Sequence, residues 1–231
     1  NLMNPLVIIG GRSPESTVSY YLHINRQINQ QKGGNYSAPL LLHSVEFQEI
    51  VDCQKSGNWS KAGEILATAA LTLQNAGAQA ILLATNTMHK VAAPIEEAIS
   101  VPFLHILDAV TQDAKKQGFH TVGLLGTHFT MQDSFYKDGL TKRGVQTLVP
   151  NSDEQAEIHR IIFDELCVGK ISETSKQFYL QTIANLAAQG ARAIILGCTE
   201  IGLLVQQNDT PVPLLDSTEI HVKKAVEFIA Q

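Results

Sequence analysis

Short aliphatic runs alternate with segments of helical periodicity along most of the chain. The runs have the length of β-strands and comprise residues 6–10, 39–45, 80–85, 102–107, 121–126, 145–149, 193–197 and 211–215. Between them, apolar residues fall on one helical stripe in 61–76 and again in 174–189. Strands that are apolar on both faces and separated by helices are typical of parallel sheets covered by helices on both sides. The sequence therefore predicts an α/β fold.

The two halves of the chain are similar to each other. The stretches VIIGGRSPEST (7–17) and VGLLGTHFTM (122–131) both run from a strand through glycine into a polar turn. Each half then ends a second strand in a small reactive side chain, Thr85 in the first and Cys198 in the second. We therefore expect two pseudo-symmetric lobes, each a parallel β-sheet flanked by helices, with the active site in the cleft between them. The first lobe should comprise residues 1–101 plus 212–231, and the second residues 102–211.

Composition excludes several classes of partner. The net charge of −5 and the scattered lysines and arginines argue against nucleic acid or an anionic membrane surface. No apolar run approaches the roughly 20 residues that a membrane helix needs. The three cysteines have no metal-ligand spacing between them and favour a reducing cytoplasm over a disulfide scaffold. We expect a cytoplasmic protein with no metal site.

The polar turns follow strands, and ligands of open parallel sheets bind beyond the carboxyl ends of the strands. Helices that begin after such turns present free N–H groups and the positive end of a dipole, which favour an anion. The side chains and amides expected to hold a substrate carboxylate are those of Asn86, Thr87, Thr199 and Glu200. In the second lobe, Thr127 and Thr130 either bind the ligand or cap the following helix. His89 similarly either orders the turn after Thr85 or touches the substrate.

Three of these stretches carry a resemblance to a known family. GGRSPEST, TNTMH and GCTEIG resemble, in order and spacing, the signature stretches of the aspartate/glutamate racemase family. The resemblance implies a cofactor-independent racemase of small amino acids that forms a homodimer. In the family, two cysteines remove and return the α-proton on opposite faces of the substrate. By position these catalytic roles fall on Thr85 and Cys198.

The pairing of a threonine with a cysteine has chemical consequences. Inverting an α-carbon requires a base on one face and an acid on the other. A free thiol ionises near pH 8.5, and a helix N-terminus lowers its pKa, so a thiolate at Cys198 is a plausible base. A threonine hydroxyl ionises far above physiological pH. The sequence therefore predicts two chemically unequal faces. The family resemblance assigns the second-lobe cysteine to the L-face of the substrate, which implies that L-substrates are favoured.

Other departures from the family concern the side chain of the substrate. The resemblance implies an arginine and a lysine that bind a side-chain carboxylate, but Glu49 and Ser172 stand near those positions, with Lys170 close by. Arg12 stands where the glycine motif usually has methionine. A guanidinium suits a carboxylate, so Arg12 either replaces the lost partner or pairs with a nearby glutamate and serves structure only.

Two alternatives remain open at this stage. The chain could be a catalytically weak protein that binds an amino acid or a dicarboxylate. It could also be a decarboxylase or isomerase of the same superfamily that needs only one cysteine, which Cys198 would supply.

Overall fold

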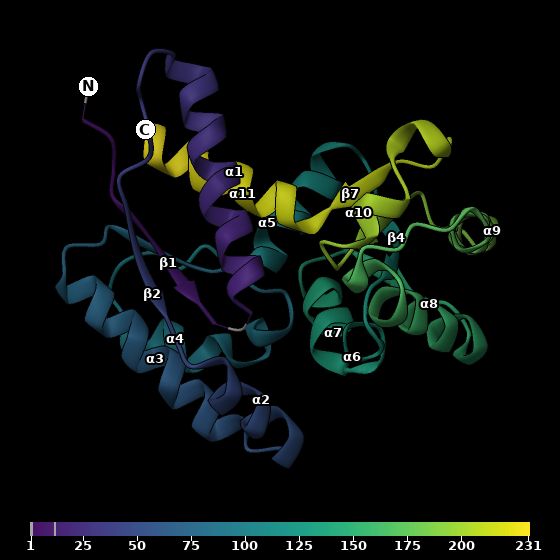
Figure 1. Cartoon of the computed structure of the whole chain (residues 1–231), viewed down its shortest axis with the longest axis horizontal. Coiled ribbons are helices and arrows are strands. Elements are labelled where there is room, and N and C mark those ends of the chain that lie inside the picture. The colour runs from purple at the N-terminus through teal and green to yellow at the C-terminus, as the bar shows by residue number, and fades with distance from the viewer. Residues whose placement is uncertain (1, 12) are drawn as a thin grey trace. The chain divides into compact units, whose positions relative to one another are not determined.

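The computed structural model describes residues 2–11 and 13–231, and the chain forms two compact units (Figure 1). Unit 1 consists of the chain up to Ile106 together with His221–Gln231, and unit 2 is Leu107–Ile220. Each unit is built around its own parallel sheet with helices beside it. The predicted α/β class and the division into two sheets are confirmed.

The sheet of unit 1 has the strand order β2-β1-β3. All pairs are parallel, so the three strands end at the same edge. The strands are β1 (Leu6–Gly10), β2 (Leu40–Ser44) and β3 (Ala80–Leu83). The helices placed along the same part of the chain are α1 (Pro14–Lys32), α2 (Phe47–Ser56), α3 (Trp59–Asn75), η1 (Thr87–Val91) and α4 (Ala92–Ala98).

Successive side chains of β1 point to opposite faces of the sheet, as strand geometry requires. Leu6 and Ile8 belong to a buried cluster with residues of α1 and of α11 (Ser217–Ala230), two helices that lie side by side in Figure 1. Val7 and Ile9 belong to a second cluster with residues of α2, α3 and α4. The strand is apolar throughout because helices cover both faces of this sheet.

The run 102–107 was expected to be a strand, but it makes a single parallel bridge, from Phe103 to Ile81. The N–H of Ile81 donates to the carbonyl of Pro102 at 2.9 Å, and the N–H of Leu104 donates to the carbonyl of Ile81 at 2.9 Å. The prediction of a full strand is wrong because Pro102 has no N–H to donate and α5 (Ile106–Lys116) begins only three residues after the bridge. The segment still marks the fourth position of the sheet.

The sheet of unit 2 has the strand order β5-β4-β6-β7, again with all pairs parallel. Its strands are β4 (Thr121–Leu125), β5 (Gln146–Leu148), β6 (Ala193–Leu196) and β7 (Leu214–Asp216). Besides α5, its helices are α6 (His128–Gln132), α7 (Ser134–Lys142), α8 (Ser152–Asp164), η2 (Leu166–Val168), α9 (Glu173–Ala188), α10 (Ile201–Leu204) and η3 (Gln207–Asp209). One buried cluster joins α8, α9 and α10 to the sheet.

The sequence assigned 212–231 to the first lobe, and the structure divides that segment. Leu214–Asp216 pairs with β6, and the N–H of Ile194 donates to the carbonyl of Pro213 at 2.9 Å. Only from His221 onward does the chain belong to unit 1. The stretches VPFLH (101–105) and VPLLD (212–216) thus occupy corresponding places in the two sheets.

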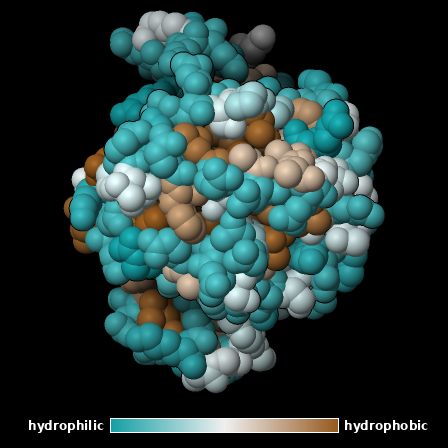
Figure 2. All heavy atoms as spheres, turned by 90° about the vertical axis from the view of Figure 1, so that its right-hand side faces the viewer, coloured by the Kyte–Doolittle hydropathy of each residue, from teal (hydrophilic) through white to brown (hydrophobic). Residues whose placement is uncertain are grey.

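Hydrophilic side chains cover most of the face in Figure 2, with smaller hydrophobic areas between them. Two exposed leucines, Leu41 and Leu42, belong to β2, which is an edge strand and is therefore covered less completely than β1.

Within residues 2–11 and 13–231, no helix combines the length and hydrophobicity needed to cross a bilayer.

Candidate active-site turns

The first candidate turn begins where β3 ends. The N–H of Ala84 donates to the carbonyl of Ile9 at 3.0 Å, and the hydroxyl of Ser16 donates to the carbonyl of Ala84 at 2.8 Å. The N–H of Thr85 turns back to the carbonyl of Leu83 at 2.9 Å, which ends the strand. Thr85 is 7% exposed. The structure therefore places it at the carboxyl end of β3, where the sequence predicted it.

The glycine turn of the first half lies against the Thr85 turn. A Cβ at Gly11 would lie 2.5 Å from Leu83 Cδ1 and 3.6 Å from Thr85 Cγ2, and a Cβ at Gly10 would lie 2.7 Å from Thr17 Oγ1. Neither glycine has a positive φ. The two glycines are needed for close approach, which brings the predicted turns of unit 1 together. Arg12 lies outside the described residues.

The residues after Thr85 form a short 3-10 segment rather than an α-helix. Asn86 stands at the N-cap position of η1 and makes no side-chain capping hydrogen bond. The hydroxyl of Thr87, which is buried, lies 3.5 Å from that of Thr85. A five-residue 3-10 segment has a small dipole, so the expected electrostatic support from a helix N-terminus is weak here.

His89 orders this turn. Its side chain is 3% exposed, its Nδ1 lies 2.7 Å from the carbonyl oxygen of Thr85, and its Nε2 accepts from the N–H of Ile106 at 3.3 Å. Of the two roles left open from the sequence, the structure supports the ordering of the turn.

The second candidate turn follows β6 in the same way. The N–H of Gly197 donates to the carbonyl of Leu125 at 2.7 Å, as that of Ala84 does in the first unit. The thiol of Cys198 donates to Oε2 of Glu200 at 2.9 Å, and the hydroxyl of Thr199 donates to the same oxygen at 2.9 Å. One oxygen of Glu200 therefore accepts hydrogen bonds both from Cys198, the predicted catalytic residue, and from Thr199, which was expected to bind the substrate.

Burial and the negative charge of Glu200 raise the pKa of the Cys198 thiol well above its ordinary value. The expected lowering by a helix N-terminus is wrong, because α10 has only four residues and Glu200 lies between it and the thiol. The raised pKa favours the protonated thiol of Cys198 over the thiolate.

Thr127 is the N-cap of α6, and Thr130 lies within that helix. The Oγ1 atom of Thr127 accepts from the N–H of Thr130 at 3.5 Å, and the two hydroxyls lie 3.3 Å apart. A Cβ at Gly197 would lie 3.2 Å from Thr130 Cγ2. The two predicted turns of unit 2 are thus adjacent, and Thr130, 1% exposed, supports the backbone beside Cys198.

Two residues near these turns were missed from the sequence. His159 accepts from the N–H of His128 at 2.9 Å, beside the Thr127 cap. Cys167 is exposed, and partial desolvation of its sulfur together with the negative charge of Glu200 raises its pKa. No sequence pattern links these residues to the turns, because they come from α8 and η2.

The positions expected to bind a side-chain carboxylate have other partners. Glu49 lies in the first turn of α2, 3.9 Å from the ammonium of Lys61, and both are exposed. Ser172 caps α9 by accepting from the N–H of Ser175. Neither supplies a positive charge.

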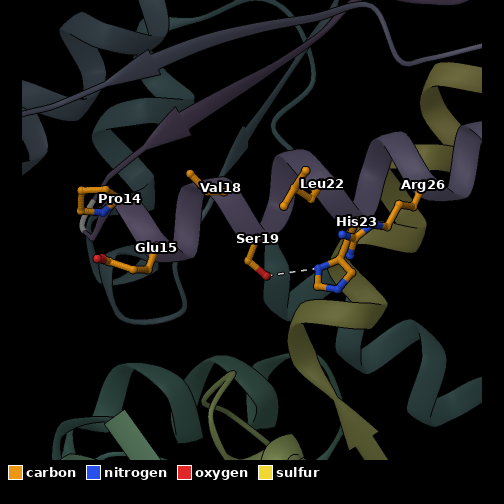
Figure 3. A pocket seen from close by; sticks show the side chains of 7 residues that line it. All are labelled: Pro14, Glu15, Val18, Ser19, Leu22, His23 and Arg26. Carbon is orange, nitrogen blue, oxygen red and sulfur yellow. Dashed lines mark hydrogen bonds between the residues drawn. The ribbon is translucent and has the colours of Figure 1, made fainter. Parts of the chain in front are cut away.

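A hollow on the surface of α1 contains none of the predicted site residues (Figure 3). One helix face forms it, where Ser19 and His23 are hydrogen-bonded at 3.2 Å. Its lining residues are Pro14, Glu15, Val18, Ser19, Leu22, His23 and Arg26. In the described ranges, no three or more His, Cys, Asp or Glu side chains are arranged to hold a metal ion.

Comparison with known proteins gives a consistent result. The family described as Asp/Glu/Hydantoin racemase matches residues 9–225. A provisionally named Asp/Glu racemase from Yersinia pestis has 46% identity and a TM-score of 0.96, over 99% of this chain and 100% of that one. An aspartate racemase homologue from Pyrococcus horikoshii has 36% identity and a TM-score of 0.90, over 99% and 100%. The broad specificity amino-acid racemase RacX of Bacillus subtilis is 27% identical over 157 residues, 68% of this chain and 67% of that protein.

Proposed function

The chain belongs to the Asp/Glu/Hydantoin racemase family, and from this premise we propose that it inverts the α-carbon of amino acids by two-base proton transfer with Cys198 and Thr85. The observation that carries the proposal is the correspondence between the two turns. Thr85 follows β3 and Cys198 follows β6, and each of these strands neighbours the first strand of its sheet on the same side. Two groups at corresponding places in a repeated fold are suited to act on opposite faces of one carbon.

The first half-reaction belongs to Cys198. Its thiol proton passes to the Glu200 carboxylate, with which it is hydrogen-bonded at 2.9 Å, and the thiolate then removes the α-proton of an L-amino acid. An ammonium group of the substrate beside Glu200 would offset the negative charge that raises the pKa of the thiol. Glu200 therefore has two roles in the proposal, in binding the substrate and in controlling the thiol.

The second half-reaction belongs to Thr85. Its hydroxyl, or a water molecule that it positions, delivers a proton to the opposite face of the carbanion. Asn86, Thr87 and Thr199 complete the proposed binding set, and Thr127 and Thr130 support it from the N-cap of α6 and the backbone beside Cys198. The reverse direction must begin with the weaker base, so L-substrates are favoured in exchange of the α-hydrogen without inversion.

We further propose broad specificity. Glu49 pairs with Lys61 and Ser172 caps a helix, so neither position offers a cation to a substrate carboxylate. Arg12, whose structure is outside the described residues, is the candidate for binding a second carboxylate. The relative from Bacillus subtilis is itself described as having broad specificity.

The remaining expectations are also proposals. We propose that the protein acts without a cofactor, as a homodimer, in the cytoplasm. The family resemblance supports the first two, and three free cysteines support a reducing compartment.

A binding protein without turnover is the second candidate, and the raised pKa of Cys198 favours it. A panel of L- and D-amino acids in deuterium oxide, with chiral analysis of each product, separates the two. A racemase incorporates deuterium at the α-carbon and inverts it, and Cys198→Ala should do neither. A binding protein would leave every α-hydrogen in place.

A further inference from the structure

Three buried histidines lie together in unit 1, and the proposed chemistry uses none of them. His89 comes from η1, His105 follows the Phe103 bridge, and His221 lies in α11. The ring centroids of His89 and His105 are 4.8 Å apart, and those of His89 and His221 are 5.5 Å apart. The side chains are 3%, 8% and 0% exposed, respectively. A buried polar cluster of this kind requires hydrogen-bond partners.

The partners of His221 fix its tautomer. Its Nε2 lies 2.6 Å from the carbonyl oxygen of Leu104, so this nitrogen carries the proton. Its Nδ1 is then an acceptor, and it accepts a hydrogen bond from the hydroxyl of Tyr20 at 2.7 Å. His221 thereby holds the backbone on one side of His105.

The partners of His89 fix the opposite tautomer. Its Nδ1 carries the proton because it faces the carbonyl oxygen of Thr85, and its Nε2 accepts from the N–H of Ile106. Only a neutral imidazole offers one donor and one acceptor. Burial and the neighbouring His105 and His221 lower the pKa of His89 well below its usual value, which keeps the ring neutral.

The hydrogen bond from His89 to the Thr85 carbonyl matters because it fixes the backbone that carries the threonine side chain. A β-branched side chain is stiff at χ1, so the position of its hydroxyl follows the position of its backbone. A group that fixes the carbonyl of Thr85 therefore fixes the direction of Oγ1. Unit 2 has no equivalent, because Gly202 stands four residues after Cys198 where His89 stands four residues after Thr85.

We propose that His89 is a positioning residue for Thr85, and that its Nδ1–H, rather than its bulk or its second nitrogen, sets the geometry of proton delivery to the D-face. This inference rests on the proposed racemase function and deepens it by assigning a residue that acts through Thr85 alone. Cys198 should not depend on it.

Two substitutions, each placing an amide near one ring nitrogen, separate the roles of the two nitrogens of His89. His89→Asn retains an N–H donor at the place of Nδ1 and loses the acceptor toward Ile106. His89→Gln retains a polar atom at the place of Nε2 and loses the donor toward Thr85. Each variant leaves one buried backbone group without its partner, so thermal unfolding should show a similar loss of stability in both.

The readout is the fate of an L-amino acid in deuterium oxide. His89→Gln should lower kcat for inversion by about 10- to 100-fold, the scale expected for a misplaced catalytic group, with KM little changed. Its exchange of the α-hydrogen without inversion should stay near that of the unmodified protein, because Cys198 is untouched. His89→Asn should invert within about threefold of the unmodified rate, since it retains the hydrogen bond that fixes the Thr85 carbonyl and with it the position of the hydroxyl.

Equal losses of inversion in both variants, or a parallel loss of exchange and inversion, would overturn the inference while leaving the proposed function intact. Absence of any exchange in the unmodified protein would overturn the proposed function and this inference with it. The ring ¹⁵N spectrum of the unmodified protein at neutral pH supplies a test that requires no variant. A neutral ring protonated on Nδ1 is expected for His89, and a charged ring or protonation on Nε2 would contradict the assignment.

Discussion

The turns after β3 and β6 share a backbone plan and differ in what controls the reactive side chain. Two residues beyond Thr85 is Thr87, whose hydroxyl lies 3.5 Å from that of Thr85. Two residues beyond Cys198 is Glu200, whose carboxylate accepts from the thiol at 2.9 Å.

The positions four residues on differ as well, with His89 in one turn and Gly202 in the other. His89 is hydrogen-bonded to the backbone of the threonine turn, whereas the cysteine turn has the negative charge of Glu200 beside its sulfur. The comparison indicates that the hydroxyl is controlled by position and the thiol by electrostatics.

The largest expected effect comes from removing the thiol. Cys198→Ala should lower racemisation of every substrate by at least about 100-fold, the scale of a lost acid–base group. The fold should survive, because alanine fits a space made for a thiol. Cys167→Ser, at an exposed cysteine outside the proposed mechanism, is the matched control and should remain active. Retention of more than a small fraction of the activity by Cys198→Ala would disprove the role of Cys198.

Making the two turns alike should have the next largest effect. Thr85→Cys supplies a second thiol and should raise α-hydrogen exchange of D-amino acids by about tenfold or more, because a thiol ionises far more readily than a hydroxyl. Thr85→Ser keeps a hydroxyl and should leave this exchange low. Deuterium incorporation followed by mass spectrometry measures both. No gain in the cysteine variant would mean that another group serves the D-face.

Neutralising Glu200 should make the thiol more acidic. Glu200→Gln removes the negative charge that raises the pKa of Cys198, although burial remains. In a Cys167→Ser background, iodoacetamide should therefore alkylate Cys198 about three- to tenfold faster at pH 7.5. Thr199→Val removes the other donor to Glu200 and retains its charge, so it should change the rate much less. An unchanged rate in Glu200→Gln would show that the carboxylate does not control the thiol.

The histidine cluster of unit 1 should make stability sensitive to acid. Burial lowers the pKa of His221 from 6.5 to about 4, so between these values the unfolded chain binds the proton and the folded chain does not. The free energy of unfolding should therefore fall as the pH falls from 6.5 toward 4, by at most about 3 kcal/mol from this residue. His221→Gln removes one of the titrating groups and should make the dependence less steep in that window, although His89, whose pKa is also lowered by burial, still contributes; urea unfolding follows the change. An equally steep dependence in the variant would assign it to other groups.

The sequence predicted the fold well because a buried parallel strand is apolar on both faces. The stripe in 174–189 became α9, Glu173–Ala188, and the stripe in 61–76 became α3, Trp59–Asn75. The apolar pattern alone predicted a full strand at 102–107. It did not show that the segment pairs only through Phe103, because a proline without an N–H limits the hydrogen bonding of a strand.

The sequence also predicted Thr85 and Cys198 as candidate catalytic residues, but it did not predict their environment. The motif places Cys198 and Glu200 two residues apart without revealing that the carboxylate turns back onto the sulfur. His105 and His221 are 116 residues apart in the sequence, and only the tertiary structure brings both of them to His89. Charge and hydrogen bonding across such separations leave no periodic pattern.

The claim that the two turns are chemically unequal is tested most directly by face-selective exchange in the unmodified protein. L- and D-enantiomers of one substrate are incubated separately in deuterium oxide, and incorporation is compared with inversion at early times. The account predicts that the L-enantiomer exchanges its α-hydrogen faster than it inverts, because Cys198 can return a deuteron to the face it came from. The D-enantiomer should show little exchange without inversion, and equal exchange of both enantiomers would contradict the account.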